Sequence, residues 1–465
     1  MCLMNICLVE STKESEESDL VVMSQTRKRC RRIFRPTWLI FLTICVCCLI
    51  HIHQVYTASR QMLGLKKRHK SMLFLSQERK MRQGRALELV VPPQEEDVAD
   101  VDKNPANCDA KKSVFFLKTH KTGSTTVTNV ILRYAEKHHL SVGLPPLRHW
   151  QLGGYPSFFD PKIVDPQLPV YDVLCHHMRY DHVTVRKVLP LNAVSVTILR
   201  DPTANFESGF SFFRDWPYPQ WFDNASAPDS LRRFLDHPDS FYNKSTPWHF
   251  RAKNYMSFDL GFDNERDDLQ YAESLIGEVE ARFNLVMITE RMEESLILLK
   301  DLLCMDSFDE ILHIRLKVRQ NSARREVSSR MRDQMMTWNL LDTNLYNHFN
   351  KTLDSKIASY GKERMGAELR KFREMLDKIE EKCVLYYDEL HLKPWISRIK
   401  LKRNSGDFCD KLSWGEVKFG DFIRNFQRHH IDTAALPQLS NDEINQLLRH
   451  AQEKVIGEKA SLYSA

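Results

Sequence analysis

The chain has 465 residues, 42% of them hydrophobic, which is long enough for one large folded domain or two ordinary ones with further segments. Its formal net charge of +6 is small for this length, so charge gives no support to nucleic-acid binding. Basic residues nevertheless crowd just before one apolar segment, at Arg27, Lys28, Arg29, Arg31, Arg32 and Arg35.

The apolar segment is TWLIFLTICVCCLIHIHQVY, residues 37–56, and it contains no Asp, Glu, Lys or Arg. Its length matches the roughly 20 residues that cross a bilayer as a helix. It lies well inside the chain and continues into His, Gln and Tyr, which favours an uncleaved signal anchor over a cleaved signal peptide. The alternative, a buried core helix, is disfavoured by the polar flanks. The preceding basic cluster predicts a cytoplasmic N-terminus and a single-pass type II topology.

The chain therefore divides into a cytoplasmic tail (1–36), a transmembrane signal anchor (37–56), a stem (57–112), a lumenal domain (113–430) and a C-terminal segment (431–465). The stem is rich in Lys, Arg, Gln and Glu, a composition typical of an unfolded tether. A second start at Met23 would leave only a short basic tail.

The cysteines and sequons agree with a lumenal domain. An oxidising compartment favours one or two disulfides, with at least one thiol left over, among the cysteines beyond the span. These are Cys108, Cys175, Cys304, Cys383 and Cys409, and their spacing leaves the pairing open. Glycosylation sequons occur at Asn224, Asn243 and Asn350. None of the cysteines has the spacing of a metal site.

Four short apolar runs predict buried strands, at residues 113–118, 170–177, 193–202 and 284–290. Segments that can be helical follow them, the clearest being 125–139. This alternation predicts an α/β fold with a mainly parallel sheet flanked by helices. Beyond about residue 328 the pattern is mostly helical, and the segment from about 391 is basic and irregular. The Lys/Glu-rich helix over 361–382 is expected to be solvated, with a homodimer contact as the alternative.

The loop after the first predicted strand carries an unusual set of side chains, within FFLKTHKTGSTT at residues 115–126. In an open α/β sheet, ligands bind beyond the carboxyl ends of the strands. Glycine permits an unusual backbone angle, successive amides can form an anion-binding nest, and lysines and hydroxyls add donors. The residues concerned are Lys118, Thr119, Lys121, Thr122, Gly123, Ser124 and Thr125. The loop lacks the Walker A pattern, and no Walker B aspartate follows, so we expect no metal.

A second anion site is indicated by ILRDPTANFESGF, where Arg200 ends an apolar run and Ser208 follows eight residues later. Asp201 and Pro202 fit the cap and first position of a helix. The strand end would present a guanidinium and the helix a hydroxyl. Alone this motif is no more specific than a structural turn, but together with the first loop it is much more so.

These motifs resemble the galactose-3-O-sulfotransferases, Golgi enzymes that include galactosylceramide sulfotransferase and use 3′-phosphoadenylyl sulfate (PAPS). The resemblance covers roughly residues 113–385 and extends to the blocks CHHMRY, FLDHPDSFYN, AKNYMSFDLGFDNE, EESLILLKDLLC and TWNLLDTNLYNHFN. It implies a P-loop-NTPase-like sulfotransferase fold and location in the Golgi membrane. It also implies sulfuryl transfer to the 3-hydroxyl of a terminal galactose on a glycolipid or glycoprotein. It assigns the first loop to the 5′-phosphosulfate, and Arg200 and Ser208 to the 3′-phosphate.

A sugar hydroxyl needs a general base. His120 lies within the loop and is our first candidate, Lys121 would stabilise charge on the transferred group, and His177 is the second candidate base. Four nearby aromatic residues fit core packing better than sugar stacking: Trp150, Tyr155, Phe158 and Phe159. Two rival functions remain open, a P-loop-type kinase acting on a small molecule or sugar and a membrane protein that binds glycans without turnover.

Overall fold

The computed structural model describes residues 108–147, 149–213, 217–222, 225, 227–316, 324–388 and 398–429. They belong to one structural unit, 102–465. The predicted tail and anchor, most of the stem, Asn224 and residues 431–465 lie outside the described part. No helix of the described part is long and apolar enough to cross a membrane.

The fold is built on a five-stranded sheet whose strands are all parallel, in the order β2-β3-β1-β4-β5. The strands are β1 (Val114–Leu117), β2 (Val142–Gly143), β3 (Val173–Leu174), β4 (Val194–Leu199) and β5 (Leu285–Ile288). Four of them fall within the predicted apolar runs. β2 was missed because its two residues lie between Ser141 and two prolines, with no apolar run around them such as the one that surrounds β3.

The register places two loops at the same edge of the sheet. β1 lies between β3 and β4, with Leu117 paired to Thr197. The loop that follows β1 and the residue that follows β4, Arg200, therefore emerge side by side at the carboxyl ends of neighbouring strands. This is where an open parallel sheet binds ligands.

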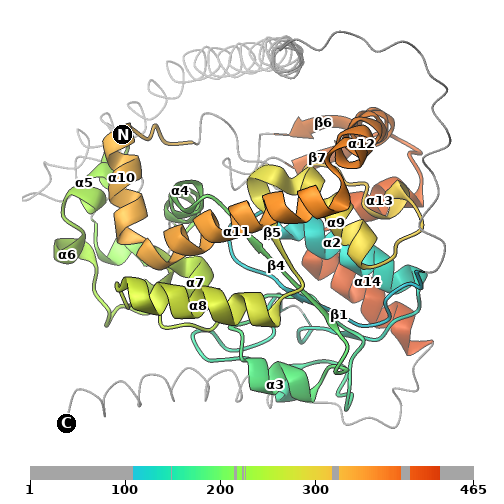
Figure 1. Ribbon diagram of the computed structural model, residues 1–465, viewed down its shortest axis with the longest axis horizontal. Helices are drawn as coiled ribbons and strands as arrows, with labels where there is room; N and C mark the ends of the chain where they lie inside the picture. The colour runs from blue at the N-terminus through green and yellow to red at the C-terminus, as the bar shows by residue number, and fades with distance from the viewer. Residues whose placement is uncertain are drawn as a thin grey trace, which may run out of the picture. The chain divides into compact units, whose positions relative to one another are not determined.

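Helices flank the sheet (Figure 1). They are α2 (Ser124–Lys137), α3 (His182–Lys187), α4 (Pro202–Phe212), α5 (Ser230–Asp236), α6 (Pro238–Phe241), α7 (Tyr255–Asp259), α8 (Leu269–Arg282), α9 (Met292–Leu302), α10 (Ser329–Trp338), α11 (Leu340–Tyr360), α12 (Lys362–Cys383), α13 (Asp407–Ser413) and α14 (Glu416–Arg428). α8 packs along α11, and α14 packs along α2. Two apolar clusters result, a main core around the sheet and an aromatic-rich cluster around α4, α5 and α7. The structure thus has the α/β architecture expected from the sequence.

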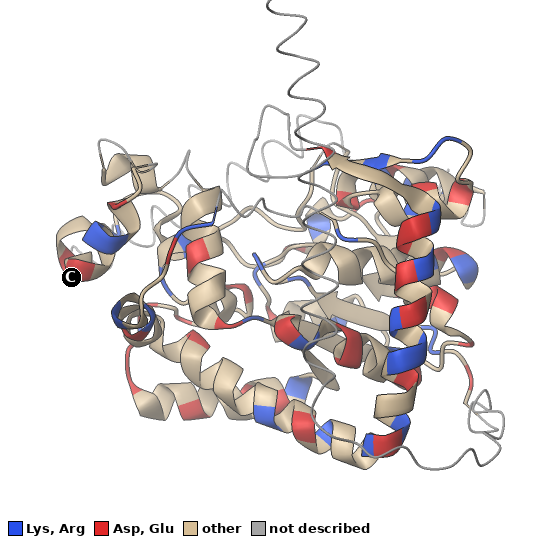
Figure 2. Ribbon diagram, turned by 90° about the horizontal axis from the view of Figure 1, so that it is seen from above, with Lys and Arg blue, Asp and Glu red and all other residues tan. Residues whose placement is uncertain are grey.

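The region after α12 is more regular than predicted. β6 (Val384–Asp388) and β7 (Arg398–Leu401) form an antiparallel pair, and α13 and α14 follow. The expectation of an irregular segment from residue 391 was wrong, because α14 places Phe419 and Ile423 on a buried face at helical spacing. α12 itself carries Lys, Arg, Asp and Glu intermixed along its length, as Figure 2 shows at the right of the view.

Two disulfides join distant parts of the unit, Cys108–Cys304 and Cys383–Cys409. Cys175 is the remaining cysteine of the described part, and it is buried beneath the sheet edge. Burial raises the pKa of the Cys175 thiol to about 12, so it stays protonated. The number of bridges and the leftover thiol agree with the expectation from the sequence.

Candidate active site

The loop between β1 and α2 bends through two residues with left-handed backbone angles. Lys121 has φ 61°, and Gly123, the N-cap of α2, has φ 69° and ψ 10°. Glycine adopts this conformation without a steric penalty, whereas a lysine there is held by its surroundings. The first amides of α2 have no partner inside the helix, so such a turn leaves them directed at the same concave space.

The carbonyl groups of the loop point away from this concave space and are held there by side chains. Four consecutive carbonyl oxygens accept hydrogen bonds from side chains: Thr119 from Ser124 (2.8 Å), His120 from Asn205 (2.9 Å), Lys121 from Arg200 (2.8 Å) and Thr122 from Thr289 (2.7 Å). Because the N–H and C=O of a peptide unit point in opposite directions, tying down the carbonyls turns the amides of Lys121, Thr122 and Gly123 outward, whereas the His120 amide is bonded to Asp259. The loop is therefore shaped as a cradle for an anion.

Most of the loop hydroxyls serve this shape. Thr119 is fully buried and donates to the carbonyl of Ile198 in β4 (2.5 Å), while its oxygen lies 3.0 Å from Thr122 Oγ1. Thr122 is also fully buried. Thr125 is partly exposed at the start of α2 and donates to Glu416 of α14 (3.4 Å). The predicted donor-binding hydroxyls are thus largely occupied in holding the turn.

Lys118 is likewise engaged within the protein. Its ammonium lies 3.3 Å from Ser124 Oγ, 3.3 Å from Thr125 Oγ1 and 3.2 Å from Glu416 Oε2, and its side chain is 1% exposed. All three of these partners belong to the protein itself. Lys118 therefore joins the end of β1 to the first turns of α2 and α14.

Lys121 and Arg200 are in direct contact. The Lys121 ammonium stands 3.5 Å from the centre of the Phe212 ring, a cation–π contact at the end of α4. Arg200 donates to the Lys121 carbonyl and approaches Glu290, with 3.8 Å from Nε to Oε1. Ser208 is buried six residues after the start of α4, about 9 Å along the helix axis. The sequence thus correctly placed Arg200 beside the loop.

His120 is held by a carboxylate that the sequence did not indicate. Its Nδ1 lies 3.0 and 2.9 Å from the two carboxylate oxygens of Asp259, and its backbone N–H donates to the same group (2.6 Å). A carboxylate only accepts, so Nδ1 carries the hydrogen and Nε2 is the basic nitrogen of the neutral ring. Tyr155 also donates to Asp259 (3.2 Å). Burial, and then the Asp259 charge, raises the pKa of the Tyr155 hydroxyl, which keeps it a donor.

His177 stacks on His120, with ring centres 3.9 Å apart and planes 15° from parallel. Its Nδ1 donates to the carbonyl of Lys118 (2.8 Å), which again leaves Nε2 as the basic nitrogen. Tyr255 covers the other face of His120 at 4.6 Å. The structure brings both candidate bases together, each with its tautomer fixed. The neighbouring His176 is buried outside this stack, and burial lowers its pKa to about 4.

The four aromatic residues that the sequence singled out differ in burial. Tyr155 and Phe159 are buried, whereas Trp150 and Phe158 are exposed.

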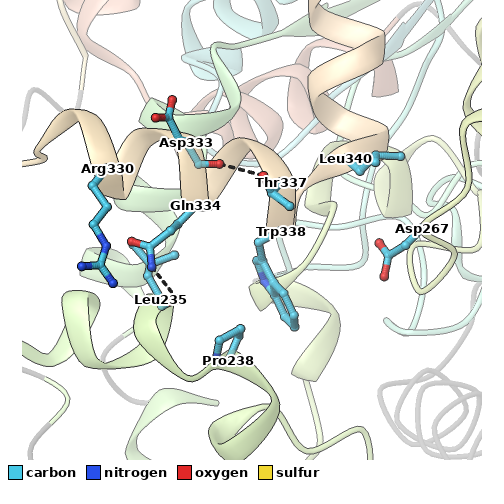
Figure 3. A pocket seen from close by; sticks show the side chains of 9 residues that line it. All are labelled: Leu235, Pro238, Asp267, Arg330, Asp333, Gln334, Thr337, Trp338 and Leu340. Atoms are coloured by element: carbon cyan, nitrogen blue, oxygen red, sulfur yellow. Dashed lines mark hydrogen bonds between the residues drawn. The ribbon is translucent and has the colours of Figure 1, made fainter.

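Of the described sequon residues, Asn243 is exposed, and Asn350 lies on α11 within hydrogen-bonding reach of Arg291 (3.4 Å). Figure 3 shows an open hollow of about 650 Å³ between α5, α6 and α10. It shares no residue with the loop, and its walls offer no arrangement like that around His120.

Three contacts of the loop were not predicted from the sequence, those of Asp259, Asn205 and Thr289. Asp259 lies 139 residues from His120, Asn205 lies 85 residues from it, and Thr289 lies 167 residues from Thr122. Asp259 lies in the block AKNYMSFDLGFDNE and Asn205 in ILRDPTANFESGF. Nothing in their spacing distinguishes them from other polar residues of these blocks.

Comparison with known proteins agrees with this geometry. The galactose-3-O-sulfotransferase family matches residues 42–403. Human galactosylceramide sulfotransferase is 36% identical over 299 residues, covering 63% of this chain and 69% of its own. Bovine galactose-3-O-sulfotransferase 3 is 39% identical over 343 residues, covering 68% and 79%. Human galactose-3-O-sulfotransferase 2 is 37% identical over 279 residues, covering 58% and 68%. The chain belongs to the galactose-3-O-sulfotransferase family and is a sulfotransferase.

Proposed function

We propose that the protein transfers a sulfuryl group from PAPS to the 3-hydroxyl of a terminal galactose on a glycolipid or glycoprotein. The observation that carries this proposal is the placement of His120. Asp259 fixes its tautomer with Nε2 as the proton acceptor, and its main chain forms part of an anion cradle at the carboxyl edge of the sheet. A base and an anion site in one loop are what transfer of an anionic group to a hydroxyl requires.

The donor fits the cradle by its charge. The outward amides at the start of α2 and the Lys121 ammonium would hold the 5′-phosphosulfate, and Arg200 with Ser208 would hold the 3′-phosphate. Lys118 shapes the loop through its pair with Glu416 rather than reaching the donor. Charge stabilisation on the transferred group would then come chiefly from Lys121, since Lys121 is partly exposed whereas Lys118 is buried.

In the transfer step, the bond from the galactose oxygen to sulfur forms as the bond from sulfur to the phosphate oxygen breaks. The electron pair of the broken bond leaves with adenosine 3′,5′-bisphosphate. The proton of the 3-hydroxyl passes to Nε2 of His120, and Asp259 stabilises the imidazolium that results. His177, stacked on the same ring, is the second candidate for this role.

The test is an assay of the full-length protein with ³⁵S-labelled PAPS and a panel of galactosides that includes galactosylceramide, lactosylceramide and β-galactosides of N- and O-glycans. We expect label at O3 of galactose. His120→Ala should lower kcat by about 10²–10⁴ while the affinity for adenosine 3′,5′-bisphosphate is kept. His177→Ala should lower kcat less.

The same assay separates the rival functions. A kinase would need ATP and Mg²⁺ and would ignore PAPS, whereas a lectin-like protein would bind galactosides without turnover and would not bind adenosine 3′,5′-bisphosphate. If the protein is folded and binds the nucleotide but transfers no label to any galactoside, the proposal is wrong. If His120→Ala keeps full turnover, His120 is not the general base, but the proposed sulfotransferase function still stands.

A further inference from the structure

We infer that Trp150 is the surface on which the galactose ring of the acceptor stacks, so that it positions the 3-hydroxyl at the paired histidines. The inference rests on the proposed function and extends it to the acceptor, for which the motifs gave no residue. It is carried by the exposure of the indole, by its angle to the histidines and by the way the main chain fixes it there.

Trp150 lies against the edges of the two histidines. Its ring centre is 6.3 Å from that of His120 and 6.0 Å from that of His177, and its plane is almost perpendicular to both, at 84° and 88°. The faces of His120 are already covered by His177 and Tyr255. The indole, nearly equidistant from both imidazoles, therefore lies beside their edges.

The position of Trp150 is set by the backbone. The next residue, Gln151, forms a parallel bridge with His177, and the N–H of Leu152 donates to the His177 carbonyl (2.6 Å). This pairing holds the backbone that follows Trp150 beside His177. Trp150 thus starts from a fixed position next to the proposed bases, and its side chain is 39% exposed.

Its aromatic neighbours have other tasks, which sets Trp150 apart. Tyr155 is buried and donates to Asp259, and Phe159 is buried in the core. Phe158 is exposed, but the guanidinium of Arg179 covers its ring at 4.2 Å. Of the four aromatic residues in this stretch, only Trp150 is both exposed and packed against the two histidines.

Galactose suits such a surface. Its axial 4-hydroxyl leaves the C–H bonds of C3, C4 and C5 on one face of the pyranose ring, which makes that face apolar. Aromatic rings offer a large, rigid apolar area with a negative face that attracts such C–H groups. Stacked in this way, the sugar would present its equatorial 3-hydroxyl at the rim of the indole, which is the side where the imidazole edges lie. One flat aromatic contact with a few polar groups is typical of small-molecule sites.

The experiment compares Trp150→Ala, Trp150→Leu and Trp150→Phe in the full-length protein, with methyl β-galactoside as acceptor. We expect Ala and Leu to raise the acceptor KM about tenfold or more, since each loses the aromatic face, while Phe keeps most of the affinity. The Kd for adenosine 3′,5′-bisphosphate should stay within about twofold of wild type, because the indole contacts the His120 ring, which is not among the groups assigned to the nucleotide.

Tyr386→Ala is the matched control, since Tyr386 is 46% exposed on β6 of the separate two-stranded sheet. It should change neither constant. If wild type transfers sulfate and Trp150→Ala keeps its acceptor KM, the inference is overturned. A lower kcat with unchanged acceptor KM would also overturn it, because the indole would then act only on the histidines. If wild type transfers no sulfate to any galactoside, the proposed function itself fails.

Discussion

Asp259 shows how one buried carboxylate can set the chemistry of a loop. It is fully buried, and it receives hydrogen bonds from the His120 ring, the His120 backbone and the Tyr155 hydroxyl. These contacts fix both the place and the tautomer of the proposed base. An amide in the same position would offer one acceptor and one donor, and the donor would favour the tautomer in which Nε2 carries the hydrogen.

We therefore expect Asp259→Asn to lower kcat by about 10²–10⁴, with little change in the affinity for adenosine 3′,5′-bisphosphate. Steady-state kinetics and nucleotide binding would be measured on the same preparation. Asp172→Asn is the control, since Asp172 accepts from Ser141 N and Oγ (2.8 and 2.7 Å) away from the histidines. Equal losses of kcat in the two variants would show a general effect on folding and not a role for Asp259.

At the scale of single residues, the sequence predicted the groups that carry charge but not those that hold them. The sequence suggested four site candidates because each is a charged or basic residue near the end of a predicted strand. They are Lys121, Arg200, His120 and His177. Asp259 and Asn205 escaped because a contact across such sequence separations follows from packing and not from spacing. Lys118 looked equivalent to Lys121 in the sequence, and only the position of Glu416 distinguishes the two lysines.

Among the elements, α14 is the one whose role was least expected. The family match ends at residue 403, yet α14 packs along α2, and the Cys383–Cys409 disulfide ties the preceding α13 to the end of α12. Asn129 of α2 donates to the carbonyls of Lys411 and Trp414 in the same region. The longer apolar runs of the sheet were readable from sequence, whereas this docking depends on side chains that meet only after the chain has folded.

The buried pair between Lys118 and Glu416 gives this packing a measurable consequence. Glu416→Ala would leave the Lys118 ammonium buried with hydroxyl partners alone, so we expect a loss of about 3–5 kcal/mol in the free energy of unfolding by urea. The double variant Lys118→Met with Glu416→Leu should recover most of that loss, because two apolar groups need no partner.

The control for this prediction is a pair at the surface. Lys137 and Asp306 are 2.6 Å apart but 43% and 71% exposed, so Asp306→Ala should cost at most about 1 kcal/mol. A loss from Glu416→Ala as small as that from Asp306→Ala would mean that α14 does not anchor the donor loop through this ion pair.

At the scale of the whole molecule, we propose a single-pass type II protein of the Golgi membrane, with residues 1–36 in the cytoplasm, a signal anchor at 37–56, a stem to 112 and the catalytic unit in the lumen. The uncharged segment and its basic N-terminal flank support this orientation. The catalytic unit supports it independently, because its two disulfides suit an oxidising compartment.

This topology predicts a specific pattern in microsomes that contain the full chain. Without detergent, protease should remove the N-terminal tail and leave a protected fragment that carries the catalytic unit, whereas detergent should expose the whole chain. The protected fragment should lose mass with glycosidase, and Asn243→Gln should abolish part of that shift, because Asn243 is exposed on a turn where the glycosylation machinery has access. Asn350 lies on α11 within reach of Arg291, so Asn350→Gln should change the mass less. Digestion of the catalytic unit in sealed microsomes would place it in the cytoplasm and refute the orientation that the basic flank predicts.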